Sequence, residues 1–158
     1  MNFLTEHGIS SYGELESKLT AISARRDTAH AEIKRIESRS AELALVMKHA
    51  GTYRQLKPLY DRYRKSNDKE KFLRGHESEI ILFEAAAREL KRLGAVPLPT
   101  TESMKTELTN LAAEKERLLA EYKAARTEAQ EYETVKQNVD ALLTVPKEQE
   151  QQRRYELE

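Results

Sequence analysis

The sequence predicts an all-α protein: a long antiparallel coiled-coil hairpin with a helical-hairpin tip, together an elongated helical bundle. Two apolar stripes that repeat about every 3.5 residues, one in each half of the chain, predict two long helices. The composition agrees, since 39% of the 158 residues are hydrophobic, 34% are charged and only 6% are aromatic. So few apolar residues suit long helices that each bury one stripe, rather than a thick globular core.

A short N-terminal turn is expected in residues 1–10, and the first coiled-coil arm in residues 11–50. The arm begins at Ser11, which together with Glu14 matches the sequence pattern of a capping box. Apolar residues then recur at alternating steps of four and three. Gly51 interrupts this pattern and is predicted to end the arm.

The segment between the arms, residues 51–100, is called the tip. Its first helix is predicted to start at a second capping box headed by Thr52, with Pro58 either kinking it or marking its first turn. A turn before Asp68 leads to a second helix, which is predicted to stop at Gly94 because glycine readily takes the left-handed conformation at a helix end.

Two short runs in the sequence are apolar all round and therefore predict helices buried on more than one side. These are residues 45–47 and residues 80–83. Such broad burial needs more than one neighbouring helix. We therefore expect the tip to fold against the adjacent end of the coiled coil as a three- or four-helix cluster.

The second coiled-coil arm is predicted in residues 101–143, with Thr101 as its N-cap and Pro146 ending the helix. Residues 144–158 form a polar, low-complexity tail, expected to be frayed. The last two of these residues resemble the remnant of a tag junction.

The similar length of the two arms predicts that they pair with each other in antiparallel orientation. The alternating steps match when the numbers of facing residues add to 158. Ala29 then faces Ala129, and Arg26 lies over the ring of Tyr132 in a cation–π contact. A shift by one heptad is the alternative register.

Residues 48–74, called the basic segment, contain nine basic and three acidic residues, whereas the whole chain has 27 of each. Cations neutralise phosphates, and tyrosine rings can stack on unpaired bases. The alternative is a solvated helix face whose tyrosines pack on the core with their hydroxyls outward. The candidate nucleic-acid-binding residues are Arg54, Lys57, Arg62, Arg64, Lys65, Lys69, Lys71, Arg74, Tyr53, Tyr60 and Tyr63.

Catalysis, a metal site and a cofactor are not expected in this chain. It has no cysteine, its four histidines are scattered without a ligand spacing, and it has no glycine-rich phosphate loop. His76 is expected on a helix face beside Phe72 and Ile80. No segment approaches the roughly 18 apolar residues that span a bilayer, and the start lacks the features of a signal peptide.

Several short segments of the sequence resemble the helical region that follows the nuclease in mobilization relaxases of Gram-positive conjugative or mobilizable elements. The resemblance extends over about residues 2–143 and is most specific in the tip. The segments that carry it are 2–6 (NFLTE), 12–15 (YGEL), 53–60 (YRQLKPLY), 63–65 (YRK), 71–73 (KFL), 76–77 (HE), 79–80 (EI), 96–99 (VPLP), 114–115 (EK) and 121–122 (EY).

The resemblance implies a non-catalytic accessory module of a conjugative relaxase in the bacterial cytoplasm. The implied partners are DNA at the origin of transfer or other proteins of the transfer complex. Relaxases nick DNA with a tyrosine and a metal held by a histidine cluster, and neither motif is present here, so no catalytic residue is transferred. The alternative is a purely structural or oligomerising coiled-coil spacer. A homodimer is compatible with either function.

Overall fold

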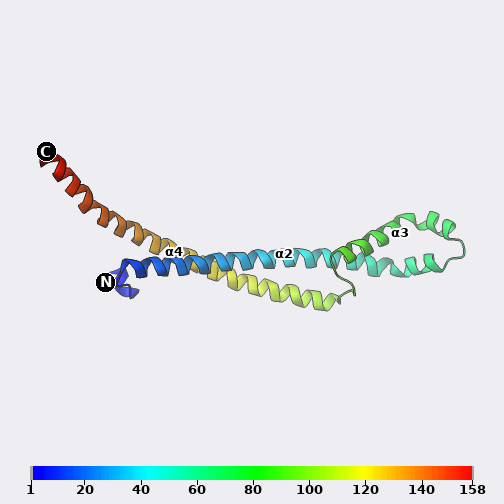
Figure 1. The fold of residues 1–158 in the computed structure, drawn as a ribbon. Helices are drawn as coiled ribbons and strands as arrows, with labels where there is room; N and C mark the ends of the chain where they lie inside the picture. The colour runs from blue at the N-terminus through cyan, green and yellow to red at the C-terminus, as the bar shows by residue number, and fades with distance from the viewer. Residues whose placement is uncertain (1, 158) are drawn as a thin grey trace. The chain divides into compact units, whose positions relative to one another are not determined.

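The computed structural model describes the backbone of residues 2–157 and the side chains of residues 2–143, so the side chains of the predicted polar tail lie outside the described residues. The described chain is all α, which confirms the predicted fold class. Its helices are α1 (Phe3–Glu6), α2 (Tyr12–Lys65), α3 (Lys69–Arg92) and α4 (Thr101–Leu157) (Figure 1).

The chain divides into two compact units, and α2 and α4 contribute to both. Unit 1 comprises residues 1–33 and 116–158, and unit 2 comprises residues 34–115. These boundaries fall inside the predicted arms rather than at residues 50 and 100. The difference arises because α2 and α4 are continuous helices, with no break at the expected arm ends.

Unit 1 is held together by a cluster of buried side chains from α2 and α4, which α1 covers. Ile22, Ala129 and Tyr132 are buried in this cluster, and Phe3 of α1 packs against it. The Tyr132 ring meets the Phe3 ring edge-on, with 5.0 Å between centroids, and the His7 ring at 5.5 Å. Burial and the nearby Glu128 and Glu131 raise the pKa of Tyr132.

The predicted cation–π contact between Arg26 and Tyr132 is therefore wrong. Arg26 forms an ion pair with its neighbour Asp27, at 3.2 Å between Nε and Oδ1. The short helix α1 folds back and supplies the aromatic partners of Tyr132 instead. The heptad pattern of the arms carries no information about where a separate four-residue helix will dock.

Interhelical ion pairs and hydrogen bonds define how α2 and α4 align within each unit. The residue numbers of the partners add to between 146 and 153 rather than to 158, so the predicted register is wrong by about one heptad, the shift left open as the alternative. A heptad pattern repeats every seven residues, so the charged side chains flanking the seam select among its registers. The pairs are Tyr12–Asp140, Glu16–Lys136 and Arg25–Glu128 in unit 1, and Arg35–Glu114, Glu37–Lys115 and Arg39–Glu107 in unit 2.

The pair of Arg39 with Glu107 has the most specific geometry of these contacts. Arg39 donates from Nε and Nη2 to the two carboxylate oxygens of Glu107, at 2.7 and 3.2 Å. This two-point hydrogen bond lowers the pKa of the Glu107 carboxyl and raises the pKa of the guanidinium. It aligns α2 with α4 in unit 2.

Helix α2 starts as the predicted capping box requires, with one change. The Ser11 hydroxyl accepts from the Glu14 backbone N–H at 3.2 Å. The Glu14 carboxylate, however, accepts from the backbone N–H and hydroxyl of Ser10, at 2.7 and 3.0 Å, rather than from the Ser11 N–H. These bonds lower the pKa of Glu14. Gly8 closes the preceding turn with φ +65°.

Helix α2 continues through Gly51 and Pro58, so the predicted break and the predicted cap at Thr52 are wrong. One interior glycine costs a helix only about 1 kcal/mol, and the buried Ala50, 1% exposed, anchors the helix directly before it. Pro58 lies between Tyr53 and Tyr60, and both of these rings stack on one ring of α3, as described below. Tertiary packing on either side thus offsets the local helix-breaking tendency.

Helix α4 also differs from the prediction at both ends. Thr100 is its N-cap, because its hydroxyl accepts from the Ser103 backbone N–H at 3.1 Å, and the predicted cap Thr101 is the first helical residue. The helix continues past Pro146, where an end was predicted.

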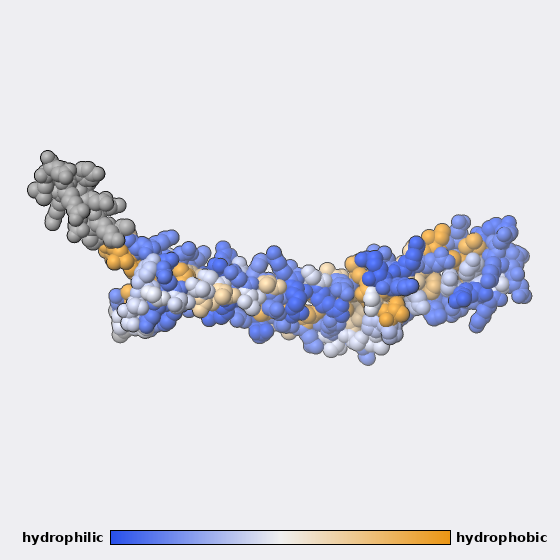
Figure 2. Space-filling view, in the orientation of Figure 1, coloured by the Kyte–Doolittle hydropathy of each residue, from blue (hydrophilic) through white to orange (hydrophobic). Residues whose placement is uncertain are grey.

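In unit 2, α3 packs along the last part of α2, while α4 packs along the preceding part (Figure 1). α2 therefore meets α4 and α3 mainly on successive stretches, and it contacts both helices where α4 begins. Within the predicted all-apolar run, Ile80 and Phe83 are buried, but Ile81 and Leu82 are 54% and 55% exposed. Leu45 is likewise 43% exposed. A single neighbouring helix covers only one face of α3, so hydrophobic patches remain on the surface of this helix (Figure 2).

Candidate nucleic-acid interface

The predicted interface residues lie in unit 2, on the last four turns of α2, the following turn and the start of α3. Both helix ends are fixed by local bonds. The Asp68 carboxylate caps α3 by accepting from the Lys71 N–H at 3.1 Å, and the Ser66 hydroxyl bridges the turn to Asp68. The two helices are thereby held as neighbours, so basic residues from both sides of the turn are brought together.

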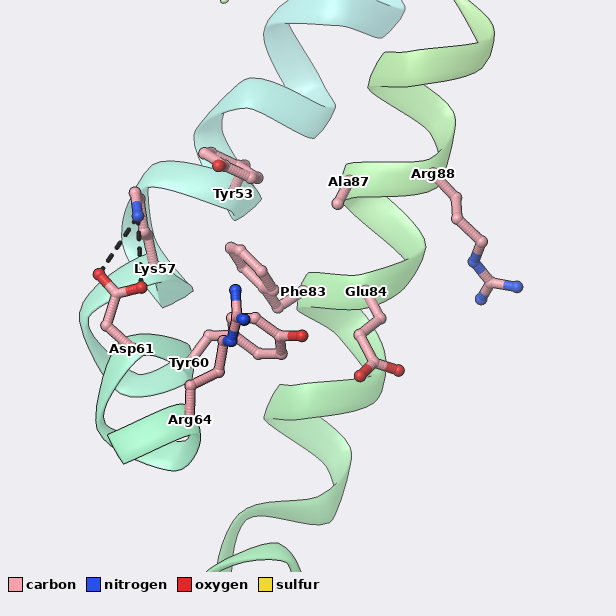
Figure 3. Close-up of a pocket in the computed structure, with 9 residues that line it drawn as sticks. All are labelled: Tyr53, Lys57, Tyr60, Asp61, Arg64, Phe83, Glu84, Ala87 and Arg88. Atoms are coloured by element: carbon pink, nitrogen blue, oxygen red, sulfur yellow. Dashed lines mark hydrogen bonds and ion pairs between the residues drawn. The ribbon is translucent and has the colours of Figure 1, made fainter. Parts of the chain in front are cut away.

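The three candidate tyrosines are half-buried and pack against rings of α3. Phe83 lies between Tyr53 and Tyr60, with centroid distances of 4.8 and 4.3 Å and nearly parallel planes (Figure 3). Tyr63 lies 5.9 Å from Tyr60 and 6.0 Å from Phe72. These contacts favour the alternative interpretation, in which the tyrosines cover the core of the tip.

These rings form one continuous series that joins α2 to α3, which we call the aromatic ladder. It extends to His76, whose ring lies 4.7 Å from Phe72 as its predicted position suggests. Its members in spatial order are Tyr53, Phe83, Tyr60, Tyr63, Phe72 and His76.

Two of the predicted basic residues are engaged in polar contacts that hold the tip together. Arg54 donates to the Thr101 hydroxyl at 2.7 Å and to the Pro99 carbonyl at 2.6 Å, so it ties α2 to the start of α4. Lys57 pairs with Asp61 at 3.2 Å, which offsets its charge (Figure 3). Both residues therefore have a structural explanation.

Two further cations contact neutral groups and so keep their charge uncompensated. The Arg62 guanidinium lies 5.7 Å from the centroid of the Phe72 ring. Arg74 donates to the backbone carbonyl of Glu70 at 3.4 Å. Both side chains are exposed.

The remaining four candidates are exposed, and no ion pair is recorded for them among the described side chains. Together with Arg62 and Arg74 they form what we call the basic cluster. Residues 62–74 contain these six cations and two acidic residues, a net charge of +4. The basic cluster is Arg62, Arg64, Lys65, Lys69, Lys71 and Arg74.

An open groove of about 580 Å³ runs between α2 and α3 beside the aromatic ladder. Tyr53, Tyr60 and Phe83 line it. Arg64 of α2 and Arg88 of α3 also line it, and the Arg88 side chain points away from α2 (Figure 3). Asp61 and Glu84 are lining residues as well, so the groove has mixed charge.

Phe72, Phe83 and Arg88 were not among the predicted interface residues. A signal for the two phenylalanines was present, because Phe72, His76, Ile80 and Phe83 follow one another at steps of four, four and three, as residues on one helix face do. What the sequence could not supply was which face of α2 this stripe would meet.

No other type of site is evident in the part of the chain whose side chains are described. It contains no group of three or more histidine, aspartate or glutamate side chains arranged to hold a metal ion. His76 is near one carboxylate, that of Glu79, at 3.7 Å. None of the helices there is apolar enough over a sufficient length to cross a membrane.

The fold and the basic cluster together define an all-α coiled-coil protein with a basic helical-hairpin tip. Comparison with known proteins finds no match to a protein-family model, to a curated protein or to a solved structure. The relaxase resemblance therefore rests on the sequence segments quoted above.

Proposed function

We propose that this chain is a non-catalytic accessory module that contacts DNA through its basic cluster during mobilization of a conjugative element. The observation that carries the DNA part is the group of six exposed cations on both sides of one turn. The side chains of Arg62 and Arg74 contact neutral groups, and the other four form no ion pair among the described side chains, so the charge of the cluster is available to phosphates. The relaxase context and a bacterial cytoplasmic location come from the sequence resemblance alone.

The function is tested by reversing charge within the basic cluster. Arg62, Arg64 and Lys65 changed together to Glu should abolish binding of fluorescently labelled DNA, measured by anisotropy at physiological salt. For the unchanged protein, the logarithm of the binding constant should fall linearly with the logarithm of salt concentration, by about 0.9 for each duplex phosphate contacted.

The matched control reverses three exposed cations of α4 that lie outside the tip, namely Lys105, Lys123 and Arg126. It changes the net charge by the same amount and should retain binding. Circular dichroism verifies that both variants stay helical. Equal weakening in the two variants, or no salt-dependent binding by the unchanged protein, would contradict the proposal and leave the structural spacer as the function.

The relaxase context has a separate test in the native gene. A nuclease with a histidine cluster encoded upstream in the same reading frame would support it. An unrelated upstream domain would contradict it without affecting the DNA-binding result.

A further inference from the structure

The aromatic ladder limits how the tip can contact a nucleic acid. Single-strand binders usually stack bases on aromatic side chains, which requires an accessible ring face. Phe83 covers one face of both Tyr53 and Tyr60, with planes within 26° and 25° of parallel. Tyr63 lies tilted between Tyr60 and Phe72. One face of Tyr53 and one face of Tyr60 are thus used in joining the two helices, and all three tyrosines are half-buried, unlike the cations beside them.

The basic cluster, in contrast, consists of exposed side chains. Arg64 and Lys65 end α2, and Lys69 and Lys71 begin α3, so charge is concentrated on both sides of the turn at residues 66–68. Contacts from such side chains go to phosphate oxygens, which carry charge but no base identity. The affinity should therefore follow the phosphate density of the ligand.

Phosphate density differs between the two forms of DNA. A duplex carries one charge per about 1.7 Å of its axis, against about 3.4 Å for each strand alone. Resting on the function proposed above, we infer that the basic cluster binds the backbone of double-stranded DNA in preference to single-stranded DNA, without a contribution from base stacking.

The experiment compares three labelled ligands with the full chain in anisotropy titrations over a range of salt concentrations. The ligands are a duplex, one of its strands, and that strand with several bases replaced by abasic sites. The duplex should bind most tightly, and its salt dependence should be about 1.3 times as steep as that of the strand for the same number of contacts. The abasic strand should bind as well as the intact strand.

Tighter binding of the single strand than of the duplex would overturn the inference. A weaker affinity for the abasic strand would do so as well, because it would show that bases stack on the protein. Either result would leave the proposed function intact, provided that the triple Glu variant at Arg62, Arg64 and Lys65 still loses binding. If none of the three ligands binds in a salt-dependent way, the proposed function fails together with the inference.

Discussion

The Tyr12 hydroxyl links α2 to α4 by donating a hydrogen bond of 2.6 Å to the Asp140 carboxylate. This bond to a negatively charged acceptor favours the protonated phenol. It is the main reason that the pKa of Tyr12 is raised from 10.0 to about 12, with smaller effects from desolvation and nearby carboxylates. One half-buried tyrosine thus reports on the alignment of unit 1.

We predict that this contact makes stability depend on pH in the alkaline range. A group whose pKa is higher in the folded state than in the unfolded state contributes its full stabilisation below the unfolded pKa of 10.0. This stabilisation is lost as the pH rises through about 12. The stability difference between the wild type and Tyr12→Phe should therefore shrink over this interval. Urea unfolding at a series of pH values measures it, and a constant difference would show that the hydrogen bond is not formed.

At the tip, the residue that matters most for folding is Phe83, which is 5% exposed and stacks on two tyrosines. We predict that Phe83→Ala lowers the free energy of unfolding by about 3 kcal/mol or more. Ile81→Ala on the opposite, exposed face should change it by no more than about 0.5 kcal/mol. Urea unfolding followed by circular dichroism gives both values, and similar losses in the two variants would contradict the aromatic ladder.

At the scale of elements, a heptad repeat determines that two helices pair but leaves several registers nearly equal in free energy. Charged and polar contacts beside the seam, such as Arg39 with Glu107 and Tyr12 with Asp140, separate these registers because they form in one alignment only. Each of these contacts adds little free energy when it is exposed. They therefore select one alignment rather than supply most of the stability.

We predict that the observed register can be trapped by a thiol cross-link. The chain has no native cysteine, and Glu16 pairs with Lys136 at 3.7 Å in unit 1. Because this contact joins the ends of two long side chains, the double variant Glu16→Cys and Lys136→Cys should be bridged within a monomer by a short bis-maleimide rather than by a disulfide. Glu16→Cys with Leu143→Cys, which fits the rejected register, should be bridged far less, because seven residues displace the partner by about 10.5 Å along a helix. Electrophoresis distinguishes the two.

At the scale of the whole molecule, the α2–α4 seam closes within one chain in each unit. Ile36 and Ala125 are fully buried without a second copy. We therefore predict that the protein is monomeric in solution, with a mass near 18.2 kDa by light scattering. A mass twice as large would indicate that the seam, or an exposed side chain such as Leu142, pairs between copies as a homodimer.

The total charge of the chain is balanced, so attraction to DNA is a local property of the tip and not of the whole molecule. With 27 basic and 27 acidic residues, the molecule as a whole has no attraction to a polyanion. Any affinity for DNA must come from the basic cluster, which makes charge reversal at the tip a stringent test of function.

The helical class, the two heptad stripes, the helix end at Gly94 and the location of the positive charge follow from the sequence alone. These properties depend on local spacing and composition, which a sequence displays directly. Tertiary structure decided the register, the docking of α1 on Tyr132, the continuation of α2 through Gly51 and the partners of the tip tyrosines. Each of these depends on contacts between residues distant along the chain, such as Tyr60 with Phe83, whose energy outweighs the local preference and appears only when the helices are packed.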